Sequence, residues 1–267
     1  MKIPVLFFIL CQFISLNSGQ ETIQFWQITD IHYDKFYAQN GDASNFCHES
    51  DFLQGQKAKR FGDYNCESSY ELLTSAIDAM ARFEPDPEFI LWTGDSSPHW
   101  SWPDSPDWTY IYNAEALIKD LLLEKFPNVT IVPVLGNHDA YKPDNFQQNR
   151  IQDKGNVANY STFEYLHFLY GSGWNELLEE DQQQLEDFAF CGFYSKEIPG
   201  ANLTILVLNT NLYYKTEIND IDPCGQLEWL ESQLLLAKNL KSRHSGMFPE
   251  VLFRFENVGR HRDFTIL

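Results

Sequence analysis

Short apolar runs alternate with helical patterns through the first half of this chain. Residues 22–29, 89–93 and 129–135 are rich in β-forming residues and have the continuous apolar character of buried parallel strands. A helical pattern fills each gap between them. Strand, helix, strand, helix, strand is the layout of a parallel sheet with right-handed crossovers, so the sequence predicts an α/β fold.

Two helices are predicted between these strands. Apolar side chains recur at helical spacing in residues 72–83, and Ser68 with Glu71 indicates a capping box at the start of this helix. Residues 109–125 are the second candidate, which ends before Pro127 because proline cannot continue a helix.

The second half of the chain is less regular. We expect a long polar loop over residues 140–160, followed by helical residues over 161–188. Residues 192–196 and 203–208 indicate two further strands, and an amphipathic helix follows Pro223.

Polar clusters follow the ends of all three predicted strands in the first half. The clusters are Asp30-Ile31-His32, Gly94-Asp95 and Gly136-Asn137-His138-Asp139. Each of them alone is typical of a turn. Because ligands of an open parallel sheet bind outside the carboxyl ends of its strands, three clusters at three such ends are expected to converge in space.

The residue types in these clusters suit a pair of metal ions. Carboxylate, imidazole and amide oxygen ligands are typical of zinc, iron or manganese. Asp30 and His32 are two residues apart, so on an extended segment they point the same way and can hold one ion. Asp95 can bridge two ions from its tight turn, and Asn137 offers a neutral oxygen to the second. Two ions about 3.5 to 4 Å apart polarise a phosphate and stabilise both oxygens of an in-line displacement.

The net charge of the chain limits the classes of partner that it can bind. Lys and Arg number 19 against 38 Asp and Glu, a formal net charge of −19 that repels a nucleic-acid polymer or an anionic membrane. A phosphate substrate then needs local positive charge, which bound metal ions supply. The expected partner is a small phosphorylated substrate, and the sequence indicates no particular oligomeric state.

The N-terminus predicts export. Residues 1–19 have a charged start, a short apolar core and small residues at the exit, as a signal peptide does, and we expect cleavage near Gly19. A buried first helix is the alternative, although nothing amphipathic occurs in this run. Neither this run nor a later segment has the length of a transmembrane helix. The expected location is therefore secreted and extracellular, or lysosomal.

Glycosylation acceptors and cysteines agree with export. The acceptor asparagines are Asn128, Asn159 and Asn202. The cysteines that remain after loss of Cys11 with the signal are Cys47, Cys66, Cys191 and Cys224. An even number of cysteines in an oxidising compartment favours disulfides, and we expect Cys47 to pair with Cys66 and Cys191 with Cys224. A structural zinc site is the alternative, but no two of these cysteines have the close spacing of a zinc knuckle.

The motifs resemble those of a known enzyme family. The three strand-end clusters are similar to those of the calcineurin-like metallophosphoesterases, and the surrounding residues agree most with the acid sphingomyelinase-like phosphodiesterases. The matching segments are Phe25 to Asp34, Trp92 to Asp95 with Pro98-His99, Val134 to Asp139, and Asp222-Pro223 with Gly225 to Leu230. The resemblance covers about residues 23–240.

This resemblance implies a fold and a chemistry. The fold is an α/β sandwich of two sheets flanked by helices. The implied activity is a secreted, zinc-dependent hydrolysis of phosphodiester or pyrophosphate bonds, with two zinc ions in an intact site. Asp30 and His32 would hold the first zinc, Asp95 would bridge, and Asn137 would hold the second.

The resemblance also assigns two histidines and a substrate class. His138 and His99 would bind the phosphoryl group, and one of them would protonate the leaving oxygen. No saposin-like segment precedes the first strand, so we expect small soluble substrates, such as nucleotides or phosphocholine conjugates, rather than membrane lipid.

The chain departs from the family's pattern after residue 240. The family has a further strand that ends in a histidine and then a Gly-His-x-His segment, whereas here only His244 and His261 follow, in neither context. We therefore expect an incomplete second sheet. The predicted divisions are a signal peptide over 1–19, a partial metallophosphoesterase domain over 20–241 and a divergent tail over 242–267. The alternative function is a catalytically impaired or inactive glycoprotein isoform that lacks the C-terminal zinc-binding histidines.

Overall fold

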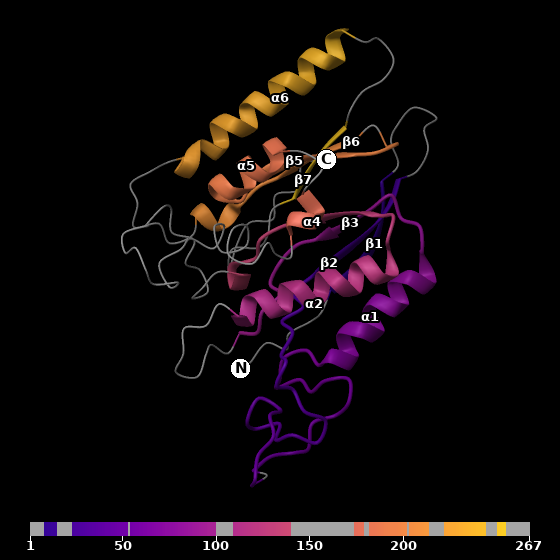
Figure 1. The fold of residues 1–267 in the computed structure, drawn as a ribbon, viewed down its shortest axis with the longest axis vertical. Coiled ribbons are helices and arrows are strands. Elements are labelled where there is room, and N and C mark those ends of the chain that lie inside the picture. The colour runs from indigo at the N-terminus through magenta and orange to yellow at the C-terminus, as the bar shows by residue number, and fades with distance from the viewer. Residues whose placement is uncertain are drawn as a thin grey trace. The chain divides into compact units, whose positions relative to one another are not determined.

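The structure is a computed structural model, and it falls into two compact units, Met1–Pro143 and Asp144–Leu267 (Figure 1). The residues that it describes are 8–14, 23–52, 54–99, 109–139, 174–178, 182–201, 203–213, 222–243 and 250–254. The boundary between the units falls inside the single domain predicted over 20–241. The predicted loop over 140–160 lies outside the described residues, as do Asn159, Asn202, His244 and His261.

The first unit contains a four-stranded sheet in the order β1-β2-β3-β4. Its strands are β1 Phe8–Ile14, β2 Ile23–Thr29, β3 Phe89–Trp92 and β4 Thr130–Pro133. The three strands that carry the polar clusters are parallel to one another, and β1 pairs antiparallel with β2. The predicted α/β class is therefore confirmed. Strand β1 lies inside the predicted signal peptide, whose removal on export stays a prediction.

Two helices cross over between the parallel strands. They are α1 Tyr70–Phe83 and α2 Thr109–Lys125. Because β2, β3 and β4 follow one another in one direction across the sheet, two right-handed crossovers place both helices on the same face, and the two helices lie side by side (Figure 1). The capping prediction was wrong by one residue. The hydroxyl of Ser69, not that of Ser68, accepts a hydrogen bond from the backbone N–H of Leu72 at 3.1 Å.

The core of the first unit lies between the sheet and these helices. All four residues of β3 are buried, which explains its continuous apolar sequence. Phe25 on β2 stacks on Phe89 of β3 with ring centroids 4.6 Å apart. The helices bury one apolar stripe each. The stripes are Leu73, Ala76, Ile77 and Met80 on α1, and Ile111, Ala114, Ile118 and Leu122 on α2.

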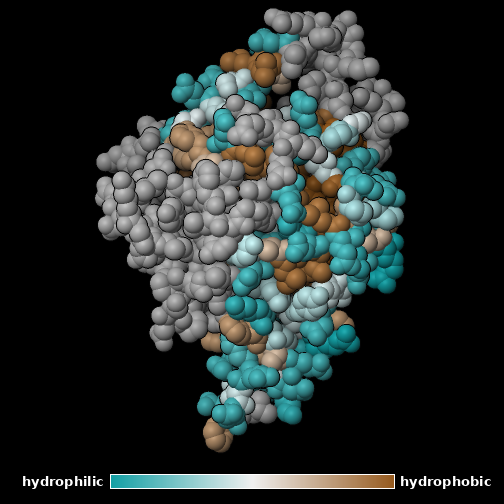
Figure 2. Space-filling model, in the orientation of Figure 1, coloured by the Kyte–Doolittle hydropathy of each residue, from teal (hydrophilic) through white to brown (hydrophobic). Residues whose placement is uncertain are grey.

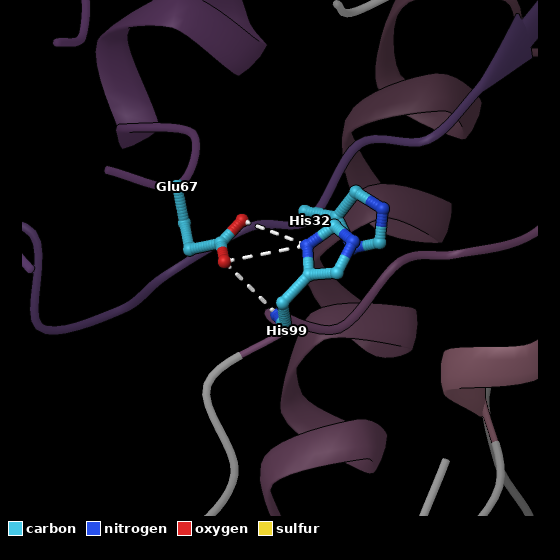
Figure 3. A group of neighbouring side chains, drawn as sticks. All are labelled: His32, Glu67 and His99. Atoms are coloured by element: carbon cyan, nitrogen blue, oxygen red, sulfur yellow. Dashed lines mark hydrogen bonds and ion pairs between the residues drawn. The ribbon is translucent and has the colours of Figure 1, made fainter. Parts of the chain in front are cut away.

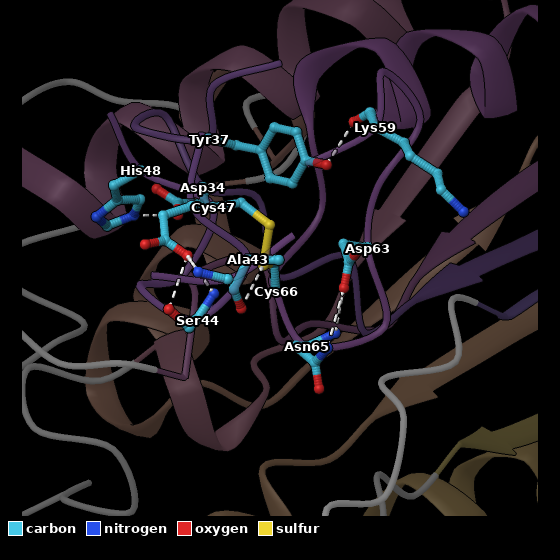
Figure 4. Close-up of a disulfide and its surroundings, with 12 residues drawn as sticks. Asp34, Tyr37, Ala43, Ser44, Cys47, His48, Lys59, Asp63, Asn65 and Cys66 are labelled. Carbon is cyan, nitrogen blue, oxygen red and sulfur yellow. Dashed lines mark hydrogen bonds and ion pairs between the residues drawn. A yellow bond between two sulfur atoms is a disulfide. The ribbon is translucent and has the colours of Figure 1, made fainter. Parts of the chain in front are cut away.

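A long loop over residues 34–69 joins β2 to α1 and has its own scaffold (Figure 4). The disulfide between Cys47 and Cys66 closes it, in the pairing that the sequence favoured. The buried carboxylate of Asp42 accepts hydrogen bonds from three backbone N–H groups of the loop, Ser44 at 2.8 Å, Gln54 at 2.6 Å and Gly55 at 2.9 Å. These bonds and the disulfide hold in place a segment that has almost no regular secondary structure.

The second unit contains a three-stranded sheet in the order β5-β6-β7. Strands β5 Tyr194–Ile198 and β6 Leu203–Val207 pair antiparallel, close to their predicted positions. Strand β7 Glu250–Arg254 pairs parallel with β6. This last strand lies in the tail over 242–267, where the sequence showed no clear period.

Helices and a second disulfide complete this unit. The helices are α4 Asn175–Leu178, α5 Gln182–Cys191 and α6 Gln226–Arg243. Cys191 at the end of α5 is bonded to Cys224 in the short helix η5 Pro223–Gly225, again in the favoured pairing.

The described residues on the face in Figure 2 are mostly hydrophilic, with apolar residues gathered in patches between them.

Among the described residues, no helix combines the length and the apolar character that crossing a membrane requires.

Candidate metal centre

The three strand-end clusters continue the sheet beyond its last regular residues. The backbone N–H of Asp30 donates to the carbonyl of Gly94 at 3.1 Å, and the N–H of His32 donates to the carbonyl of Asp95 at 2.9 Å. The backbone N–H of His138 donates to the Oδ1 atom of Asp95 at 2.8 Å. These bonds tie the clusters after β2, β3 and β4 into one layer at the carboxyl edge of the sheet.

Three residues of this layer have a left-handed backbone. The φ angles are 54° at Asp30, 44° at His32 and 53° at Asp95, in a region that residues with a Cβ atom rarely occupy. Such strain persists where the surrounding structure enforces it, and it concentrates at functional sites. The prediction that Asp30 and His32 lie on an extended segment was therefore wrong. Their side chains nevertheless converge, because the left-handed residues turn the chain at the end of β2.

Two glycines allow the second and third clusters to touch. Gly94 has a φ of 83°, and a Cβ atom added to it would lie 2.1 Å from the backbone nitrogen of Gly136. A Cβ atom added to Gly136 would lie 2.2 Å from the backbone nitrogen of Asp95. Because real Cβ atoms do not approach other atoms so closely, only glycine fits at both positions.

The side chain of Asp139 links the second and third clusters by hydrogen bonds to their backbone. Its fully buried carboxylate accepts hydrogen bonds from the backbone N–H groups of Asp95 at 3.0 Å, Ser96 at 2.9 Å and Gly136 at 2.7 Å. Asp139 is the last residue of the third predicted cluster, and no role was predicted for it. Two of these three partners, Asp95 and Ser96, lie more than 40 residues earlier in the sequence, and no local pattern reveals such contacts.

Asp30, His32 and Asp95 form a group that can hold a metal ion. One ligand atom from each of them lies within 4.8 Å of the other two. The Nδ1 atom of His32 lies 2.7 Å from the carbonyl oxygen of Ser97, so Nδ1 carries the hydrogen and Nε2 is left as the ligand atom. This Nε2 atom is 3.6 Å from the Oδ2 atom of Asp95.

The electrostatics of this group fit a cation. Burial, together with the nearby carboxylates of Asp139 and Asp30, raises the pKa of Asp95 to about 8. Burial and the neighbouring rings of His99 and His138 lower the pKa of His32, which keeps its imidazole neutral. A clustered pair of carboxylates beside a neutral imidazole lacks positive charge, and a divalent cation would supply it.

Asn137 lies at the start of the short helix η1 Asn137–Asp139, next to the histidine whose backbone contacts Asp95. All four predicted metal ligands therefore belong to the connected strand-end layer. Which of them bind an ion stays a prediction.

Two further histidines pack against His32. The ring centroid of His99 lies 3.8 Å from that of His32, and the centroid of His138 lies 5.1 Å from it. The rings of His99 and His138 are 4.4 Å apart. Burial, reinforced by the charge of His99, lowers the pKa of His138 to about 4. Burial alone would lower the pKa of His99 too, but the hydrogen bond and charge of Glu67, together with the charges of Asp95 and Asp30, outweigh it, and this pKa is raised.

Glu67 is a residue of this site that sequence reasoning missed. Its carboxylate contacts both the backbone and the ring of His99 (Figure 3). The predicted site was assembled from residues that follow strands, whereas Glu67 follows a cysteine near the end of the long loop. No motif in the sequence distinguishes it from the chain's other acidic residues.

Comparison with known proteins identifies relatives of this chain. A human protein named cyclic GMP-AMP phosphodiesterase SMPDL3A is 34% identical over 224 residues, which are 82% of this chain and 46% of that protein. Sphingomyelinase phosphodiesterase C of Dictyostelium discoideum is 33% identical over 230 residues, 84% of this chain and 47% of its own length. Acid sphingomyelinase-like phosphodiesterase 3b of the mouse is 33% identical over 220 residues, which are 80% of this chain and 44% of that protein.

The chain spans about half the length of these relatives. The profile of the family described as calcineurin-like phosphoesterase matches residues 23–252, which include every strand-end cluster and both sheets except β1 and the last residues of β7. The resemblance drawn from the motifs is thereby confirmed, and the chain belongs to the calcineurin-like phosphoesterase family.

Proposed function

We propose that this protein is a zinc-dependent phosphodiesterase that hydrolyses phosphodiester or pyrophosphate bonds of small soluble substrates, such as nucleotides or phosphocholine conjugates. The observation that carries the proposal is the convergence of Asp30, His32 and Asp95, all with a strained backbone, at the edge of a parallel sheet. The relatives' names, a cyclic GMP-AMP phosphodiesterase and sphingomyelinase phosphodiesterases, support the phosphodiester bond as the common target.

The proposed roles follow from the chemistry of each side chain. Asp30 and His32 would hold one zinc ion, Asp95 would bridge, and Asn137 would contribute an oxygen to the second. Bound zinc would supply the positive charge that polarises the phosphate and stabilises the transition state. The other residues of the site would then act on the substrate itself.

Two histidines would act on the phosphoryl group. The ring of His99 is 46% exposed, so it can reach a substrate, and we assign it the proton that goes to the leaving oxygen as the bond from phosphorus to that oxygen breaks. We assign to the more buried His138 a hydrogen bond to a phosphoryl oxygen. Water would add to phosphorus from the side opposite the leaving oxygen and lose its proton to the solvent, and His99 would regain a proton from the solvent.

We also propose that the protein is exported, either to the cell exterior or to lysosomes. The signal-like residues 1–19 and the glycosylation acceptors support this location, and Asn128, the acceptor that the structure describes, is exposed. Two closed disulfides also suit an oxidising compartment.

The test of the proposed function measures zinc and turnover together. Purified protein is dialysed against zinc-free buffer, its zinc content is measured by mass spectrometry, and hydrolysis of a bis-nitrophenyl phosphodiester is followed with and without added zinc. Bound zinc and zinc-dependent hydrolysis are expected, both lost on chelation. Hydrolysis that survives chelation, or a protein that binds zinc but hydrolyses no phosphodiester or pyrophosphate even when a complete family-type C-terminal half is attached, would contradict the proposal.

A further inference from the structure

The carboxylate of Glu67 faces a histidine of the site. We propose that Glu67 is a positioning residue for His99: it holds one hydrogen of the ring on Nδ1, so that the proton that the protonated ring gives to the leaving oxygen comes from Nε2 and the ring is left in its Nδ1–H form. The inference rests on the proposed function, because it takes His99 to be the residue that acts on the leaving oxygen.

The contacts of Glu67 hold His99 at two points (Figure 3). One carboxylate oxygen, Oε1, accepts the backbone N–H of His99 at 3.1 Å. The Nδ1 atom of the ring lies 3.3 Å from Oε1 and 3.4 Å from Oε2. The Glu67 side chain is 8% exposed, whereas the His99 side chain is 46% exposed. A buried carboxylate therefore contacts the Nδ1 edge of the ring, while much of the ring stays accessible to a substrate.

The backbone around Glu67 is anchored on both sides. Cys66 before it is held by the disulfide to Cys47. Ser68 after it donates its backbone N–H to the carbonyl of His32 at 3.0 Å and accepts the N–H of Asp34 at 3.0 Å. Ser68 thus extends the metal-site layer as a parallel bridge with Tyr33. Glu67 is fixed relative to the predicted ligand His32, which is the property that a positioning residue needs.

A different reading makes Glu67 a metal ligand, since His32, Glu67 and His99 also offer ligand atoms within 4.8 Å of one another. The hydrogen bonding of His32 argues against it. With Nδ1 bonded to the carbonyl of Ser97, His32 has one ligand atom, Nε2, and a single imidazole nitrogen binds one ion. That atom already serves the group with Asp30 and Asp95. A carboxylate within 3.4 Å of an imidazole nitrogen has the geometry of a hydrogen-bond partner.

The tautomer of His99 tests the inference directly. The full 267-residue chain is labelled with 15N-histidine, and long-range nitrogen–proton correlations are recorded at mildly alkaline pH, where imidazoles are neutral. The signals of His99 are assigned by their loss in a His99→Gln chain. We expect His99 in the Nδ1–H form, and we expect Glu67→Met to shift it toward the Nε2–H form that an unpartnered imidazole favours.

A matched control is Glu88→Met. Glu88 also accepts a backbone N–H, that of Gln24 at 2.7 Å, but no hydrogen bond or ion pair of a ring to it is found among the described residues. The tautomer of His99 should be unchanged in this variant. If the Glu67→Met chain does not fold, the unaltered chain decides alone, because His99 in the Nε2–H form there would overturn the inference.

Metal content and kinetics separate positioning from ligation. Glu67→Met should retain the zinc of the unaltered chain and lower kcat about 10- to 100-fold with little change in KM, the usual size of such effects. Loss of zinc would make Glu67 a ligand and overturn the inference. Absence of turnover in the unaltered chain, even with a complete family-type C-terminal half attached, counts against the proposed function, whereas the tautomer still decides the role of Glu67.

Discussion

At the residue scale, the site depends on a few positions where backbone and side chain are both constrained. Asp30, His32 and Asp95 hold left-handed conformations because backbone hydrogen bonds between the strand-end clusters enforce them. Their side chains are thereby set before any ion binds. Preorganised ligands lower the cost of assembling a metal site, which explains why strain is tolerated there.

Asp95→Ala should abolish metal binding. Asp95 belongs to the first ligand group and is the proposed bridge, so its loss removes one ligand from each ion. Zinc per chain, measured by mass spectrometry after dialysis, should fall to background. The exposed Asp86, substituted in the same way, is the control and should leave zinc unchanged. Equal zinc in the two variants would show that the metal lies elsewhere.

Gly94→Ala should destabilise the chain more than Gly200→Ala. The two glycines have nearly the same φ, 83° and 81°, but a Cβ atom at Gly94 would meet backbone at 2.1 Å, whereas at Gly200 nothing lies within 4 Å. The shared cost of a left-handed alanine is about 1–2 kcal/mol. Forcing apart the strand-end clusters should add about 1–3 kcal/mol to the loss at Gly94. Urea unfolding of both variants measures the difference, and equal losses would mean that the clusters part without strain.

At the element scale, strands were predicted well and their connections less so. The apolar runs at β3 and β4 gave their positions to within a few residues, because a buried parallel strand is apolar on both faces. The helix cap was misplaced because Ser68, with Glu71 three residues later, matches the capping box in sequence, whereas in the fold Ser68 pairs with Tyr33 and Ser69 caps the helix. Strand β7 was missed because its neighbour β6 lies over 40 residues earlier.

The candidate site shows the same division. The residues at the carboxyl ends of the parallel strands could be predicted, because topology brings such ends together whatever the loops do. Glu67 and Asp139 could not be assigned roles, because these depend on contacts to His99 and to the backbone around Asp95 that form only in the folded chain. Sequence patterns therefore found the proposed ligands and missed the groups that hold the site in place.

Removing the disulfide of the long loop should lower stability substantially. The bond between Cys47 and Cys66 spans 19 residues, and closing a loop of that size contributes about 3 kcal/mol by restricting the unfolded chain. Urea unfolding of the Cys47→Ser, Cys66→Ser double variant should show a loss of about that size. The corresponding double variant at Cys191 and Cys224 tests whether any loss of site function is specific to the first loop. An unchanged unfolding midpoint would mean that the loop's hydrogen bonds suffice.

At the scale of the whole molecule, export would change the first sheet, because cleavage of the signal peptide would remove strand β1. We expect the secreted protein to begin near residue 20 and to lose mass on enzymatic deglycosylation, as N-terminal sequencing and gel mobility will measure. Cleavage removes β1 and uncovers the outer edge of β2, which then needs another cover or stays exposed. Asp30 and His32 should still bind metal, because their backbone N–H groups donate hydrogen bonds to residues that follow β3, not to β1. Protein that stays inside the cell, retains Met1 and shows no mobility shift would contradict export.

The last prediction concerns activity, and it follows from ligand counting. A catalytic zinc ion commonly has about three protein ligands and an open position. Asp30, His32 and Asp95 would meet that number for one ion, whereas the second would have Asp95 and Asn137 among the proposed ligands. A weakly held second ion removes half of the clamp on the attacking and leaving oxygens. A polypeptide of these 267 residues alone is therefore expected to hydrolyse a nitrophenyl phosphodiester slowly, even with added zinc. The same residues 20–240 joined to the C-terminal half of the human relative should turn over much faster. Comparable rates would contradict the prediction. They would mean that His244 or His261 reaches the metal site and completes the ligands of the second ion.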